Sequence, residues 1–144
     1  MADFCIERRI YYHDTDAGGV VYYGNYLEHL EEGRTEFCLD RGVDTRSLKD
    51  GGIVFPVVHI EIDYKSPARY MDTIRVFTRV EKIGTASIRF QQEIMRGEQL
   101  LIKAVTVWAC TQVRPGQSDV AGESVDGNFR AVPVPEEVRK RLSV

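Results

Sequence analysis

The sequence has little of several features that would assign a protein to a class at once. Its 19 basic and 22 acidic residues give a formal charge of −3, and it has no long basic run, so the electrostatic footprint of a nucleic-acid-binding protein is missing. No stretch approaches the ~20 apolar residues of a membrane span. The start MADFCIERRI has no apolar segment of a secretion signal after its charges. We therefore expect a cytoplasmic protein.

Cysteine is also scarce. Cys5, Cys38 and Cys110 are odd in number and widely spaced, and no two of them form a CxxC pair. This spacing argues against a disulfide framework and a structural zinc site, and it fits a reducing compartment. We expect three small buried hydrophobic side chains and no metal site.

What is present describes one folded domain. The 144 residues allow a sizeable core but are too few for two ordinary domains. A content of 43% hydrophobic and 28% charged residues is that of a folded protein rather than a disordered one. We expect a single domain over residues 1–144.

Hydrophobic periodicity predicts one strand, one long helix and then four more strands. Alternation over 4–12 indicates the first strand, and apolar residues at i, i+3, i+4 and i+7 from Tyr22 indicate an amphipathic helix that ends at Gly42. The later strands are expected at 53–64, 73–83, 86–95 and 99–113. Because their links are too short for crossover helices, most neighbouring strands must be antiparallel. The predicted class is α+β, with one helix on an antiparallel sheet.

The last part of the sequence departs from this regular pattern. Residues 114–134 are polar and rich in glycine and proline, and the segment is long for a loop inside a compact domain. We expect a mobile excursion, or one that follows the surface. A short helix is predicted to follow, around Glu136 to Leu142.

A chemical hypothesis comes from YYHDTDAGGVVYYGNYLEHLEEGRTEF, residues 11–37, which places Asp14 and Asp16 beside Gly18 and Gly19 just before the helix. The first-turn N–H groups of a helix lack intrahelical partners and lie at the positive end of its dipole, so they can hold a developing oxyanion. Glycines let the backbone approach a ligand, and an aspartate can attack a polarised carbonyl or activate water. The arrangement suits acyl transfer or hydrolysis. An Asx-turn and N-cap leading into a core helix would give the same spacing.

The same stretch resembles the signature of the 4-hydroxybenzoyl-CoA thioesterase family of hotdog-fold proteins. Within that family it is most similar to the bacterial acyl-CoA thioesterases associated with the Tol-Pal envelope system. The matching elements are D-x-D-x-x-G-V-V-Y, then N-Y, then E-x-x-R, here Glu31 and Arg34; IDYKSPARYMD at 62–72 matches a second family segment. The resemblance implies a hotdog fold, a five-stranded antiparallel sheet wrapped around one long central helix. It also implies homodimers or homotetramers with active sites at the subunit interface.

The resemblance further implies hydrolysis of an acyl- or aryl-CoA to free acid and CoA. Asp16, the second aspartate of D-x-D, would act as nucleophile or general base, two alternatives that stay open. Gly19 matches the family glycine, and the N–H groups near Tyr23 and Gly24 would form the oxyanion site. No metal or redox cofactor is implied, and coenzyme A enters as part of the substrate.

Three departures from the family pattern stand in the same region. Tyr23 occupies a position where the Tol-Pal group usually has histidine, and a tyrosine there is closer to the aryl-CoA members. His13 replaces a commonly acidic residue, and Gly33 replaces a better helix former. The first two bear on substrate choice. They leave the chemistry intact, because position 23 contributes chiefly through its backbone.

Other polar residues are candidates for structural roles or substrate contacts. We expect Asp14 to hold the loop through backbone amides, His29 to be solvated, and His59 to be solvated or in an intersubunit contact. Glu31 and Arg34 are interpreted as an ion pair, within the helix or between subunits, and Glu31 alternatively lines the acyl pocket across the dimer. The substrate-contact candidates are His13 at the pocket lip and, for the CoA phosphates, Lys65, Arg69 and Arg89.

Two other functions remain as alternatives. A hotdog hydratase or dehydratase is one, because fold does not fix function. Such enzymes typically rely on a histidine and a carboxylate at other positions. A non-catalytic acyl-CoA-binding module is the other, and an intact Asp16 argues against it. The acyl group, the carrier (CoA or acyl carrier protein) and the choice between dimer and tetramer stay open.

Overall fold

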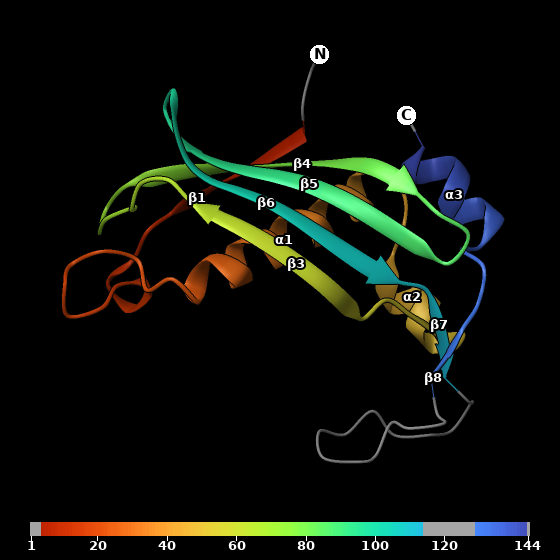
Figure 1. Cartoon of the computed structure of the whole chain (residues 1–144). Coiled ribbons are helices and arrows are strands. Elements are labelled where there is room, and N and C mark those ends of the chain that lie inside the picture. Colours follow the sequence, from red (N-terminus) through yellow and green to blue (C-terminus); the bar gives the residue numbers. More distant parts are fainter. Residues whose placement is uncertain (1–3, 114–128, 144) are drawn as a thin grey trace.

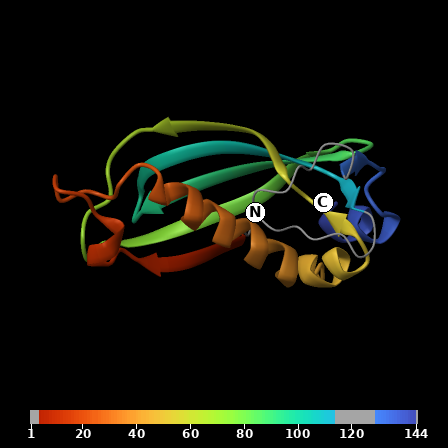
Figure 2. The same cartoon turned by 90° about the horizontal axis from the view of Figure 1, so that it is seen from below.

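The computed structural model describes residues 4–113 and 129–143. A five-stranded antiparallel sheet, in the order β1-β4-β5-β6-β3, curves around the helix α1 (Figures 1 and 2). The helix spans Asn25–Asp40, and the strands are β1 (Phe4–Arg9), β3 (Val57–Tyr64), β4 (Thr73–Ile83), β5 (Ser87–Arg96) and β6 (Gln99–Ala109). The predicted α+β class, with a five-stranded antiparallel sheet wrapped around one long helix, is confirmed.

Alternation along the strands explains how the sheet holds the helix. The buried side chains of β5, at every second position, are Ile88, Phe90, Gln92 and Ile94. Arg89 and Glu93 stand at the other positions and therefore lie on the outer face. The core forms two clusters along α1, one including Leu30 and the other including Phe37. The helix is thus fixed on the sheet along most of its length.

Gly33 accounts for the close approach of α1 to the sheet. A Cβ at this position would lie 2.8 Å from Cγ1 of Val76 and 2.9 Å from Nε2 of Gln92 and Oγ1 of Thr78. Without a Cβ, the Gln92 side-chain amide can donate to the backbone carbonyl of Leu30 at 2.9 Å. The glycine that looks like a weak helix former is therefore suited to this packing.

Two predicted strands are each broken in the structure. The expected strand 53–64 divides at Pro56, which has no N–H for a ladder, into β2 (Ile53–Val54) and β3. The expected strand 99–113 divides at Cys110 into β6 and β7 (Thr111–Val113). A second sheet, β2-β7-β8, uses these short pieces together with β8 (Phe129–Ala131), which falls in the expected loop segment. Residues 114–128 of that segment lie outside the described residues.

Two short helices stand at the end of the sheet opposite the β1–α1 loop (Figure 1). The periodicity did not predict α2 (Thr45–Asp50), whose N-cap Asp44 accepts from the backbone N–H groups of Arg46 at 2.9 Å and Ser47 at 3.4 Å. The helix is only six residues long and buries no residue, so it gives no apolar period. At the C-terminal end, α3 (Glu136–Leu142) lies where the sequence predicts a helix. In the described ranges no helix is long and apolar enough to cross a membrane.

Candidate active site

The turn after β1 presents the carboxylate of Asp16 at the surface. Its Oδ1 accepts the backbone N–H of Gly18 at 2.8 Å, and its own N–H donates to the carbonyl of Val20 at 2.9 Å. Gly19 has φ +78°, a left-handed conformation that favours glycine, and its N–H donates to the carbonyl of Asp16 at 3.0 Å. Oδ1 is therefore engaged in the turn, whereas Oδ2 accepts no hydrogen bond within the described residues.

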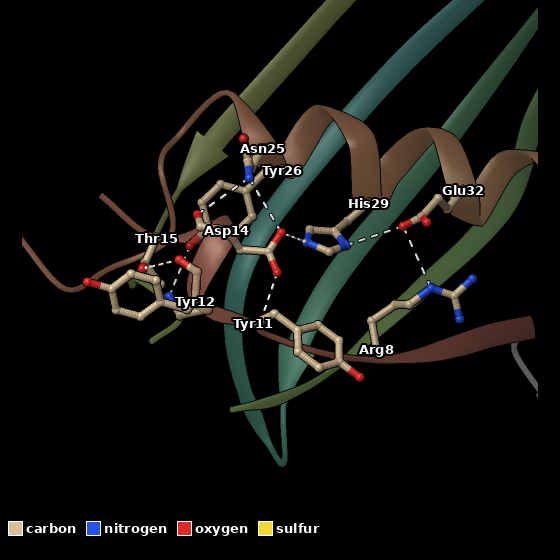
Figure 3. Close-up of polar contacts among 10 residues, drawn as sticks. Arg8, Tyr11, Tyr12, Asp14, Thr15, Asn25, Tyr26, His29 and Glu32 are labelled. Carbon is tan, nitrogen blue, oxygen red and sulfur yellow. Dashed lines mark hydrogen bonds and ion pairs between the residues drawn. The ribbon is translucent and has the colours of Figure 1, made fainter. Parts of the chain in front are cut away.

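Asp14 anchors this turn from inside (Figure 3). It lies in the short 3-10 helix η1 (Tyr12–Asp14) and is 5% exposed. Its Oδ2 accepts the backbone N–H of Tyr11 at 2.9 Å, and its backbone carbonyl accepts the N–H of Tyr22 at 3.0 Å. The Asn25 side-chain amide also contacts Oδ1, at 3.4 Å. The expected structural role of Asp14 is confirmed.

The start of α1 provides unpaired N–H groups close to this turn. Gly24 is at the N-cap position and offers no side-chain cap. The N–H of Asn25 is bonded to the carbonyl of Tyr22 at 2.8 Å, but the backbone N–H groups of Tyr23 and Gly24 have no acceptor in the part of the chain that the structure describes. A Cβ on Gly24 would lie 2.8 Å from the Tyr22 ring, so glycine suits this position. Two free donors at a helix start can stabilise an oxyanion.

Aromatic rings surround these donors. A cavity of about 260 Å³ is lined by Val21, Tyr23, Tyr26, Tyr64, Lys65, Ser66 and Pro67. The Tyr64 hydroxyl donates to the carbonyl of Tyr23 at 3.3 Å. Tyr26 is buried, its hydroxyl accepts the backbone N–H of Ala68 at 2.9 Å, and burial raises the pKa of this phenol. The cavity is thus largely aromatic, with a lysine among its lining residues.

Three of the substrate-contact candidates lie around this part of the chain. Lys65 lines the aromatic cavity. Arg69 is exposed, and its backbone forms a β-bridge with Val20, directly after the Asp16 turn. His13 is exposed in η1, and its ring stacks on Tyr11 with a centroid distance of 5.8 Å. All three are available to a ligand at this end of the molecule.

The other two candidates are not brought together with Asp16 within one chain. Glu31 lines a second cavity, of about 590 Å³, together with residues that include Thr35, Val57 and Trp108. Arg89 lies on the outer face of β5, and its Nε forms an ion pair with Oε2 of Glu81 at 2.7 Å. A contact between either side chain and a substrate at Asp16 therefore requires a second chain or a ligand that extends around the sheet.

The expected ion pair between Glu31 and Arg34 does not form within the chain. Arg34 is 5% exposed, and its Nη1 donates to Oε1 of Gln92 at 3.0 Å and to Oγ1 of Thr106 at 3.3 Å. Burial lowers the pKa of this guanidinium, and the nearby charge of Glu31 opposes that shift. The signal was present in the sequence, because Arg34 falls on the apolar stripe of the helix, where a side chain faces the sheet.

His29 is buried, so the expectation that it is solvated is wrong. It is 7% exposed and lies between two carboxylates, with Nε2 3.5 Å from Oδ1 of Asp14 and Nδ1 3.4 Å from Oε1 of Glu32 (Figure 3). Its position three residues after the buried Tyr26 gives the helical period that could have revealed it. His59, in contrast, is exposed on β3, where its Nε2 lies 3.3 Å from Oε1 of Glu61.

Comparisons with known proteins agree with this geometry. Residues 11–142 match the model of the thioesterase-like superfamily, and the chain belongs to that superfamily. The acyl-CoA thioesterase YbgC of Haemophilus influenzae is 34% identical over 137 residues, which cover 94% of this chain and 91% of that protein. The 1,4-dihydroxy-2-naphthoyl-CoA hydrolase of Synechococcus elongatus is 29% identical over 119 residues, 81% of this chain and 88% of that protein.

Solved structures give the same result for the fold. A hypothetical protein from Aquifex aeolicus superposes with a TM-score of 0.83 at 25% identity, covering 97% of this chain and 99% of that one. The resemblance to hotdog thioesterases is therefore confirmed. Within the ranges 4–113 and 129–143, no group of three or more His, Cys, Asp or Glu side chains is placed to hold a metal ion.

Proposed function

We propose that this protein hydrolyses the thioester of an acyl- or aryl-CoA to the free acid and CoA, with Asp16 as the reacting carboxylate. The observation that carries the proposal is the exposed Asp16 carboxylate in a tight turn next to a helix start whose Tyr23 and Gly24 N–H groups are unpaired. Membership of the thioesterase-like superfamily and the names of the YbgC and dihydroxynaphthoyl-CoA relatives support the same reaction.

The geometry suits both routes open to a carboxylate. As a nucleophile, Oδ2 of Asp16 attacks the thioester carbonyl carbon, CoA leaves as a thiolate that takes a proton, and water hydrolyses the resulting anhydride. As a general base, the same oxygen removes a proton from water, which attacks the carbonyl instead. Either route puts negative charge on the carbonyl oxygen. The N–H groups of Tyr23 and Gly24 would donate to that oxygen.

We further propose that the working unit is a two-fold dimer, alone or paired into a tetramer, with each acyl site built from both chains. β3 is an edge strand of the sheet and carries exposed apolar side chains, with Val57 47%, Val58 61%, Ile60 36% and Tyr64 50% exposed. A free apolar edge is a template for pairing with another strand. Antiparallel pairing of two β3 strands would bring the Val57 end of one chain beside the Tyr64 end of its partner. The Glu31 cavity of one chain would then face the aromatic cavity of the other.

The substitution Ile60→Lys tests the assembly, because Ile60 lies at the middle of β3 and a two-fold axis there would place two like charges side by side. Sedimentation at micromolar concentration should change from dimer or tetramer to monomer, and turnover should fall with the oligomer fraction. Glu98→Gln, in the exposed turn between β5 and β6, raises the net charge by the same one unit away from β3 and should change neither. A wild-type monomer that retains full activity would refute the dimeric site.

Thiol release from a panel of acyl-CoA substrates tests the reaction and the acyl preference. Tyr11, Tyr12, Tyr22 and Tyr23 are exposed around the proposed site, so we expect benzoyl- and butyryl-type CoA to give higher kcat/KM than palmitoyl-CoA. The same acyl groups on acyl carrier protein identify the carrier. Loss of an enoyl-CoA double bond without thiol release would indicate a hydratase. Tight binding of acyl-CoA with no thiol released would indicate a binding module.

We also assign the activity to the cytoplasm and to one domain that covers residues 1–144. Cys5, Cys38 and Cys110 are all free thiols. Burial raises the pKa of Cys38 to about 12, so this thiol stays protonated and unreactive at neutral pH. Three unpaired cysteines support a reducing compartment.

A further inference from the structure

Four ionisable side chains form a line from the Asp16 turn along α1 to β1 and have no part in the proposed chemistry (Figure 3). Oδ1 of Asp14 lies 3.5 Å from Nε2 of His29, and Nδ1 of His29 lies 3.4 Å from Oε1 of Glu32. The same Glu32 oxygen lies 3.6 Å from Nε of Arg8 on β1. His29 is therefore the buried centre of this line, with a carboxylate facing each ring nitrogen.

Burial alone disfavours a charge on His29, but the two carboxylates that face its ring nitrogens favour the charged form. Neither ring nitrogen makes an aligned hydrogen bond, although both lie within ion-pair distance of a carboxylate oxygen. A neutral imidazole has one N–H and one lone pair, so one ring nitrogen would face a carboxylate oxygen without a proton, which is repulsive. An imidazolium is attracted by both carboxylates, and charge attraction depends on distance more than on angle. The geometry thus suits a ring that carries a proton on each nitrogen.

The surroundings of Asp14 also favour a protonated His29. It is 5% exposed, and its other partners are the neutral backbone N–H of Tyr11 and the neutral amide of Asn25. Among the described residues, His29 is the one cationic group in contact with this carboxylate. A buried carboxylate without a cation is strongly unfavourable. With His29 protonated, the two negative charges of Asp14 and Glu32 are balanced by His29 and Arg8.

We propose that His29, as an imidazolium, is a positioning residue that holds Asp14 in place. Through Asp14 it holds both the Asp16 turn and the proposed oxyanion donors at the start of α1. The carbonyl of Asp14 accepts the N–H of Tyr22, next to the proposed oxyanion donors, and Asp14 stands two residues before Asp16. The ion pairs exist while His29 holds its second proton and are lost as the pH rises. Turnover should therefore fall on the alkaline side when His29 deprotonates. The inference rests on the proposed catalytic role of Asp16.

An NMR titration of the full chain with nitrogen-15-labelled imidazoles tests the charge state without any activity measurement. We expect both His29 nitrogens to carry protons over the pH range of maximal activity and the ring to lose one proton above it. The His29→Gln variant assigns the His29 signals against those of His13 and His59. A His29 ring that is neutral throughout the active range overturns the proposal, whatever the protein hydrolyses.

Kinetics test the positioning role. In the His29→Gln variant the side chain keeps one donor but carries no charge at any pH. Its kcat should be at least tenfold lower than that of the wild type, with KM within about threefold. The decrease of kcat at alkaline pH should disappear. Glu32→Gln, which removes one carboxylate from His29, should move that decrease to lower pH. The matched control Glu137→Gln removes an exposed carboxylate that pairs with Arg141 on α3 and should change neither parameter. A folded His29→Gln variant with wild-type kcat and pH profile would overturn the positioning role, whereas an active Asp16→Asn variant would refute the proposed function and leave the NMR result standing.

Discussion

Asp16→Asn should lower kcat by about 10²–10⁴ while the protein folds normally, and a lost nucleophile would lower it further. Asparagine keeps the shape of the side chain, and its Oδ1 can still accept the N–H of Gly18 that closes the turn. It lacks the negative charge that attacks the carbonyl or deprotonates water. KM should change far less, because the proposed CoA contacts, Lys65 and Arg69, lie outside the Asp16 turn. Thiol release under saturating substrate, with circular dichroism as the check of folding, measures the effect.

Asp14→Asn is the matched control for this substitution, because it makes the same change two residues away. Asp14 is buried and bonded to the Tyr11 N–H, and it lies against His29, so loss of its charge should affect stability more than Asp16→Asn does. Its effect on kcat should be the smaller of the two. An Asp16→Asn protein that folds and turns over its best thioester within about threefold of the wild type would contradict the mechanism.

The sequence was sufficient for those features that depend on neighbouring residues. The turn around Asp16, the anchoring by Asp14 and the start of α1 all fall within a few consecutive positions, so motif spacing and helical period could predict them. The antiparallel pairing of β4 with β5 and of β5 with β6 also followed, because their links are too short for a crossover. The pairing of β3 with β6 and of β1 with β4 joins distant segments and did not follow from the links. The breaks at Pro56 and Cys110 were missed because alternation continues across both positions.

Features that depend on distant residues could not be predicted in the same way. Arg34 and Gln92 are 58 positions apart, so a reading of the helix alone assigned Arg34 to its local neighbour Glu31. His29 meets Asp14 only because the η1 turn packs against α1, which helical spacing by itself does not reveal. The same limit applies to Glu31 and Arg89, whose contacts with a substrate at Asp16 would require a partner chain or a ligand that extends around the sheet. Periodicity can predict that a polar side chain is buried, but it cannot predict which distant residue that side chain contacts.

Gln92→Leu should lower the free energy of unfolding by about 2–3 kcal/mol. The loss arises because the buried guanidinium of Arg34 gives up one hydrogen bond and two neighbouring polar groups lose a partner. The Gln92 side chain accepts from Nη1 of Arg34 at 3.0 Å and lies 2.9 Å from both the Leu30 carbonyl and Oγ1 of Thr78. Leucine fills similar space but satisfies none of these groups. Arg34 would keep Thr106 as an acceptor, which limits the loss. Urea unfolding at one fixed protein concentration measures the change, because oligomerisation makes apparent stability depend on concentration.

Gln91→Leu supplies a control at the next position of the same strand. Gln91 lies on the outer face of β5 and is bonded to Arg79 and Glu81 at the surface, so its replacement should change stability by no more than about 0.5 kcal/mol. The double variant Arg34→Met with Gln92→Leu removes both members of the buried pair. It should be more stable than the sum of the two single losses implies, because no charge is left without its partner. Equal losses from Gln92→Leu and Gln91→Leu would show that this buried network does not hold α1 on the sheet.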